Sequence, residues 1–183
     1  MLFLLLGAIL LAPVPVSDTT ISFGVIKRDL TGDGIPETLS LVGTGPTLRS
    51  LRVTFTIQSA DHTLFSDTWP LIRPPDGRQT TSDAQLRTRI KTYGASFFNA
   101  SKFRSPTAFL ADLQQSARRH IALIPSVIAR DLASADTSRA RVIWEQMRSS
   151  PIVIFEFSSG GDAVTALGWS SSDNRFYHLF ECC

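Results

Sequence analysis

The sequence predicts an α+β domain with a mostly antiparallel sheet: strands come first, then about three helices, then strands again, with the helices packed on one face. Towards both ends of the chain, apolar residues alternate with polar ones, which is typical of strands with one buried face. In the middle, apolar residues recur at helical spacing. The short connections between strands favour hairpins, and therefore antiparallel pairing.

Size and composition indicate one globular domain. The chain has 183 residues, of which 43% are hydrophobic and 19% are charged, as in ordinary folded proteins. Residues 18–183 are therefore expected to form a single α+β domain around one core.

The first residues are expected to direct export. The apolar run that ends at Ala12 is too short to span a membrane, but it has the length of a signal-peptide core, and Pro13 and Pro15 follow it. Residues 1–17 are therefore predicted to be a removed signal peptide, with an uncleaved N-terminal anchor as the alternative. The protein is expected to be secreted, in the periplasm or outside the cell.

Four strands are expected in the first part of the chain. Residues 20–26 and 38–42 alternate polar and apolar side chains on either side of a short loop, so this loop closes a hairpin. Residues 51–57 alternate again, and residues 63–69 follow after a turn at Asp61-His62.

The middle of the chain predicts about three helices. The apolar stripe of the first is Leu86, Ile90, Tyr93 and Phe97. The second begins at Ser105-Pro106, and Pro125 ends or kinks it; its stripe is Leu110, Leu113, Ala117, Ile121 and Ile124. The third begins near Asp136, and its buried side is Ala140, Ile143, Trp144 and Met147. These stripes are expected to be core.

After Pro151 the chain returns to strands, expected at residues 152–155, 163–169 and 176–180. The chain ends in Cys182 and Cys183, its two cysteines. Adjacent side chains of a strand point to opposite faces, so a disulfide between them needs a strained ring. A thiol pair without a catalytic role, a bridge between the two, and a link to another chain remain open.

The loop between the first two strands, Asp29-Leu-Thr-Gly-Asp-Gly-Ile-Pro-Glu37, has the chemistry of a calcium site. Asp29, Thr31 and Asp33 are spaced two apart, so their oxygens can converge in a tightly wound loop. The glycines allow backbone angles that are closed to other residues. Glu37 adds a third carboxylate. An EF-hand is not expected, because Ser40 stands at the twelfth position, where that loop has glutamate.

This nine-residue spacing resembles the calcium loops of FG-GAP and VCBS-type repeats, which lie in β-hairpins of exported proteins and run Asp-x-Asp/Asn-x-Asp-Gly-x-x-Asp. The resemblance covers the loop and its flanking strands only. It implies a structural Ca²⁺ ion whose ligands are Asp29, Thr31, Asp33, Glu37 and the backbone carbonyl of Ile35.

The chain departs from that pattern where Thr31 replaces a carboxylate or amide and Glu37 replaces aspartate. Those families build propellers from many copies of the repeat; no second copy occurs here, so no propeller is expected. The alternative interpretation of the loop is an Asp-Gly turn that closes the hairpin without a metal.

Charge is distributed unevenly along the chain. The formal net charge of +2 is too small to indicate a nucleic-acid partner. From Arg73 to Arg148, thirteen Lys and Arg stand against six Asp and Glu, whereas the rest of the chain carries five against ten. The favoured interpretation is solvated arginine-rich helix faces, and an anionic ligand or membrane surface is the alternative. The expected partner is an unknown protein or an anionic ligand.

No catalytic residue is predicted. The sequence contains no Gly-x-Ser-x-Gly, no His-Glu-x-x-His and no phosphate-binding glycine loop with lysine. The favoured function is a calcium-stabilised, non-enzymatic binding domain. The alternative is a small extracellular hydrolase, which a polar pocket with His120 or His178 beside an acidic residue would favour.

Overall fold

The computed structural model describes residues 18–71, 82–116, 123–159 and 163–182. The predicted signal peptide, residues 117–122 of the second predicted helix (among them Ala117, His120 and Ile121) and Cys183 lie outside these segments. In the described residues, eight strands form two antiparallel sheets, and four α-helices accompany them. The α+β class and the order of strands, helices and strands are confirmed.

The first sheet has the strand order β1-β2-β3-β4. Its strands are β1 (Thr19–Arg28), β2 (Glu37–Gly45), β3 (Arg52–Ser59) and β4 (His62–Pro70). Every neighbouring pair is antiparallel and follows directly in sequence, as the alternating patterns predict. The β1–β2 hairpin pairs Arg28 with Glu37, so the predicted calcium loop closes it.

The second sheet has the strand order β5-β6-β7-β8 and is also antiparallel. Its strands are β5 (Phe103–Arg104), β6 (Ile154–Ser158), β7 (Val164–Ser170) and β8 (Arg175–Cys182). The sequence pattern does not distinguish one sheet from two, because alternation identifies the buried face of a strand but not its neighbours.

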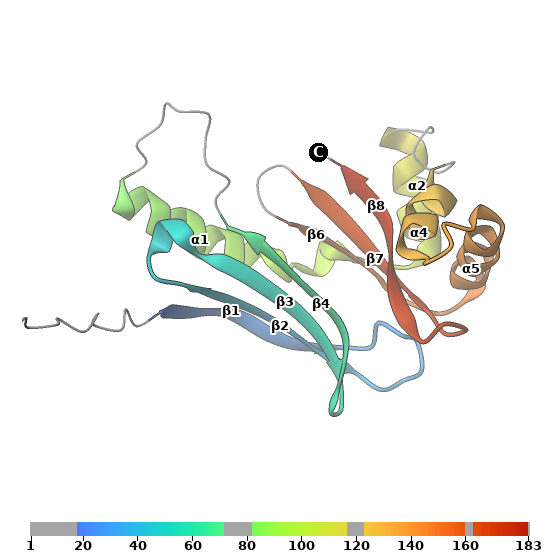
Figure 1. Cartoon of the computed structure of the whole chain (residues 1–183), viewed down its shortest axis with the longest axis horizontal. Coiled ribbons are helices and arrows are strands. Elements are labelled where there is room, and N and C mark those ends of the chain that lie inside the picture. Colours follow the sequence, from blue (N-terminus) through green and yellow to red (C-terminus); the bar gives the residue numbers. More distant parts are fainter. Residues whose placement is uncertain (1–17, 72–81, 117–122, 160–162, 183) are drawn as a thin grey trace, which may run out of the picture.

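The helices are α1 (Asp83–Phe97), α2 (Pro106–Ser116), α4 (Ile124–Asp131) and α5 (Thr137–Ser149), with short 3-10 turns η1 (Leu48–Ser50) and η2 (Ala100–Lys102). Helices α2, α4 and α5 gather beside the second sheet, away from the first, whereas α1 lies along the first sheet (Figure 1). Within the described segments, no helix is long and apolar enough to cross a membrane.

The expectation that the second helix ends or kinks at Pro125 needs correction. A separate helix, α4, begins at Ile124 with Pro125 in its first turn. Proline is tolerated there because the first N–H groups of a helix have no intrahelical acceptor. Ile124 and Ile128 are fully buried, so α4 belongs to the core.

One aromatic core lies between the two sheets. The ring of Phe55 on β3 lies 5.3 Å from that of Phe155 and 5.2 Å from that of Phe157, both on β6. Tyr93 of α1 also joins the sheets: its hydroxyl accepts a hydrogen bond from Trp69 Nε1 of β4 (3.1 Å) and donates one to the Ser158 carbonyl of β6 (2.8 Å). Burial raises the pKa of Tyr93, so this hydroxyl stays protonated.

Candidate metal loop and adjoining cavity

The loop from Asp29 to Glu37 is wound tightly by its first aspartate. Gly32 and Gly34 have φ angles of +77° and +87°, which only glycine adopts readily. Asp29 Oδ1 accepts a hydrogen bond from the Gly32 N–H at 2.7 Å, and Asp29 Oδ2 accepts one from the Gly34 N–H at 2.9 Å. These two bonds curl the backbone around the Asp29 carboxylate.

Three of the predicted ligands converge. Carboxylate oxygens of Asp29, Asp33 and Glu37, one from each residue, all lie within 4.8 Å of one another. Thr31 joins the group through its hydroxyl, which donates to Glu37 Oε1 at 3.0 Å. At Ile35, whose backbone carbonyl is the fifth predicted ligand, the N–H donates to Asp33 Oδ1 at 2.7 Å.

Glu37 is the most deeply placed member of this cluster, with only 1% of its surface exposed. Its second oxygen, Oε2, accepts a hydrogen bond from the Leu30 N–H at 2.7 Å. No Lys, Arg or His nitrogen of the described residues forms an ion pair with Glu37. A buried carboxylate without a cationic partner is costly, and its position favours a cation.

The donors suit a hard cation. Calcium takes six to eight oxygens from carboxylates, hydroxyls, carbonyls and water. Asp29, Asp33 and Glu37 would hold such an ion, with the Thr31 hydroxyl beside them. These ligand types suit a hard cation such as calcium, and further oxygens, from water or backbone carbonyls, would have to complete its shell.

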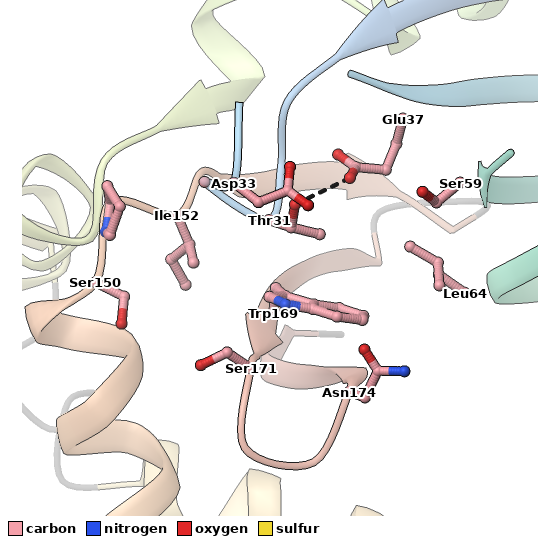
Figure 2. Close-up of a pocket in the computed structure, with 12 residues that line it drawn as sticks. Thr31, Asp33, Glu37, Ser59, Leu64, Ser150, Ile152, Trp169, Ser171 and Asn174 are labelled. Carbon is pink, nitrogen blue, oxygen red and sulfur yellow. Dashed lines mark hydrogen bonds between the residues drawn. The ribbon is translucent and has the colours of Figure 1, made fainter. Parts of the chain in front are cut away.

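The loop forms one wall of a cavity of about 410 Å³ where the ends of the two sheets meet. Figure 2 shows Thr31, Asp33 and Glu37 facing the indole of Trp169 across this cavity. The other walls come from the β3–β4 hairpin, the turn between β7 and β8 and the segment between α5 and β6; they include Ser59, Leu64, Ser171, Asn174 and Ser150–Ile152.

The loop is packed directly on the segment that precedes β6. The Val153 N–H donates to the Leu30 carbonyl at 3.1 Å. A Cβ atom on Gly32 would lie 2.8 Å from the Pro151 carbonyl oxygen, so only glycine allows this approach. The β1–β2 hairpin of the first sheet is thereby attached to the segment that leads into β6 of the second sheet.

A separate histidine–carboxylate pair lies between α4 and β8. His178 Nδ1 is 2.9 Å from Asp131 Oδ2, which also accepts the His178 N–H at 2.8 Å. The hydrogen bond to Asp131 raises the pKa of His178 above its ordinary value of 6.5. Burial opposes ionisation of Asp131, but its hydrogen bonds with His178 prevail and lower its pKa below 3.8.

The sequence indicated the loop and named His178 as a candidate, but it indicated neither the opposite wall of the cavity nor Asp131 as the partner of His178. Trp169 and Asn174 are far from the loop in the chain, and Asp131 is 47 residues from His178. No local spacing relates such positions. A nearby signal was the break between the strands expected at residues 163–169 and 176–180, where Asn174 adopts a φ of +52°.

Comparison of the chain with protein-family models, with curated proteins and with solved structures gave no match.

Proposed function

We propose that this protein is an exported, non-enzymatic binding domain stabilised by one calcium ion in the loop from Asp29 to Glu37. The observation that carries the proposal is the convergence of three carboxylates within 4.8 Å, one of them on the buried Glu37. In the absence of a cation these groups repel one another. Outside the cell, calcium is abundant enough to fill a site of modest affinity.

The ion would act on the cavity as well as on the loop. The Leu30 carbonyl holds Val153, and Gly32 touches Pro151, so a loop fixed by calcium also fixes the segment that lines the opposite side. The partner would enter at this cavity or at the arginine-rich helices, and is an unknown protein or an anionic ligand. Nothing in this role requires nucleic acid.

Thermal melting tests the calcium site. In millimolar calcium the melting temperature of the parent should exceed that in chelator by about 1–6 °C, as expected for a weak extracellular site in a chain of this size. Asp33→Ala should lose this increase. Asp61→Ala, which removes an exposed carboxylate at the β3–β4 turn, should keep it. A parent that melts alike in calcium and chelator would exclude the site.

The Asp131–His178 pair supports a second candidate, a small hydrolase in which Asp131 orients His178 as a general base. His178 lines neither the cavity beside the loop nor the cavity beside Arg28, and we favour binding because three carboxylates converge in the loop. A hydrolase would cleave p-nitrophenyl esters and lose this activity in His178→Gln. Equal rates of ester cleavage in parent and variant would exclude this hydrolase and leave the binding domain as the supported function.

A further inference from the structure

A second cavity, of about 550 Å³, borders the same Ser150–Ile152 segment as the first. Its volume is typical of sites for small molecules. The described residues that line it include three arginines, Arg28, Arg104 and Arg148, and no carboxylate. Thus the segment before β6 separates an acidic cavity from a basic one.

Arg28 supplies a positive charge that no carboxylate of the described residues pairs with. It lies opposite Glu37 in the β1–β2 ladder, yet its guanidinium stands 4.6 Å from the centre of the Phe103 ring. Stacking on an aromatic face holds a guanidinium in place without using its N–H donors. Those donors remain available to a ligand.

Arg104 is held rigidly at the wall of the cavity. Its Nε donates to the Ser101 carbonyl at 3.2 Å, one Nη contacts Asp112 and the other lies 3.9 Å from Glu156. Lys102 lies 3.8 Å from the same Glu156. The positive charges of Arg104 and Lys102 are offset by the carboxylates of Asp112 and Glu156, so Arg104 mainly shapes the wall of the cavity.

Arg148 is paired, but in a way that a ligand can replace. Its partner is Glu145, one turn earlier on α5, at 2.9 Å, and the two side chains are 51% and 59% exposed. An exposed pair of this kind contributes little in water. Arg148 can therefore exchange this carboxylate for an anion in the cavity.

The start of α2 contributes to the same cavity. Ser105 caps the helix by accepting a hydrogen bond from the Ala108 N–H at 3.2 Å, and Pro106 is the first helical residue. Both line the cavity. The positive end of the helix dipole adds to the field of the arginines.

Charge balance among the described residues favours an anion here. Around the cavity, Arg28, Lys102, Arg104 and Arg148 stand against Asp112, Glu145 and Glu156, one more cation than carboxylate. We propose that this cavity binds one oxyanion group, either free phosphate or the phosphoryl group of a small molecule. Arg28 and Arg148 would contact it through the planar donor fork that suits such groups.

Titration calorimetry at constant ionic strength tests this site, with inorganic phosphate and phenyl phosphate as ligands. Phosphate should bind the parent with one site per chain at millimolar concentration or below. Arg28→Gln and Arg148→Gln should each weaken binding about tenfold, since each loses a charge-assisted hydrogen bond. Tighter binding of phenyl phosphate would identify a small phosphorylated molecule as the ligand, and equal binding would identify free phosphate.

Arg130→Gln is the matched control, because Arg130 is 60% exposed and paired to Glu181 at 2.9 Å away from this cavity. It should bind phosphate like the parent. Arg28→Lys, which keeps the charge over Phe103, replaces Arg28→Gln if the latter fails to fold. No heat of binding in the parent, or equal weakening by Arg130→Gln, would overturn the proposal. The calcium-dependent melting of Arg28→Gln should be unchanged, which separates this site from the loop.

Discussion

The two sheets face each other across one aromatic core but differ in what covers their other faces. On the first sheet, the outer face carries two hydroxyl pairs: Ser40 with Thr56 at 2.5 Å, which is partly buried, and Thr54 with Thr68 at 3.0 Å, which is exposed. On the second sheet, β7 is buried on both faces from Thr165 to Ser170. The first sheet therefore tolerates change on its outside, whereas the second is the rigid support of the domain.

The largest effect is expected from Phe155→Ala on β6. Phe155 is fully buried, and its ring contacts Phe55 of the first sheet and Phe103 of the second. Its truncation should lower the free energy of unfolding by about 3–5 kcal/mol, because it removes apolar contacts and leaves a cavity. Urea denaturation measures this loss.

Thr54→Ala, on the outer face of the first sheet, is the variant to compare with Phe155→Ala. It removes one exposed hydrogen bond to Thr68, so the free energy of unfolding should fall by about 1 kcal/mol or less. Similar losses in the two variants would contradict the distinction between the aromatic core and the tolerant outer face of the first sheet.

An intermediate effect is expected where the sheets are attached to each other. Gly32→Ala should lower the free energy of unfolding by about 1–3 kcal/mol, because it strains a positive φ and places Cβ 2.8 Å from the Pro151 carbonyl. Gly34→Ala strains a similar φ but meets nothing within 4 Å, so it should cost less. Equal losses would show that the contact with Pro151 is unimportant.

A smaller effect than that of Gly32→Ala concerns the attachment of α4 to β8. Asp131→Asn should cost about 1 kcal/mol near pH 5.5, where both members of the Asp131–His178 pair are charged. The pKa of His178 is higher in the folded protein than its value of 6.5 in the unfolded chain. The stability that His178 contributes is therefore complete below pH 6.5 and is lost as the pH rises through the folded pKa. Since the pKa of Asp131 is lowered, its contribution is lost only as the pH falls below 3.8.

Urea denaturation at about pH 5.5 and about pH 9 should therefore show a larger cost of Asp131→Asn at the lower pH. In a His178→Gln background, Asp131→Asn should lower the free energy of unfolding by the same amount at both pH values. A cost that does not change with pH in the parent would contradict the ion pair.

Local patterns predicted the strands well where one face is wet. In the first sheet, β3 was expected at residues 51–57 and runs from Arg52 to Ser59, because alternation is clear when polar side chains face solvent. In the second sheet, β6 was expected at residues 152–155 but begins at Ile154. Ile152 is buried in the preceding segment, so its apolar character did not distinguish strand from linker.

Other features depend on distant residues and were not predictable. The two-residue strand β5 is too short to show any period. The two cavities combine the loop from Asp29 to Glu37 and Arg28 with Trp169, Arg148 and the segment before β6, which only tertiary packing brings together. The loop itself was recognisable because its oxygens are close in sequence as well as in space.

Titration of the metal-free protein with calcium, followed by calorimetry, tests the central claim most directly. We expect one calcium ion per chain, a dissociation constant of about 10⁻⁴–10⁻³ M, and loss of binding in Asp33→Ala but not in Asp61→Ala. Absence of binding at millimolar calcium, or binding that survives Asp33→Ala, would show that the loop from Asp29 to Glu37 is a hairpin turn without a metal.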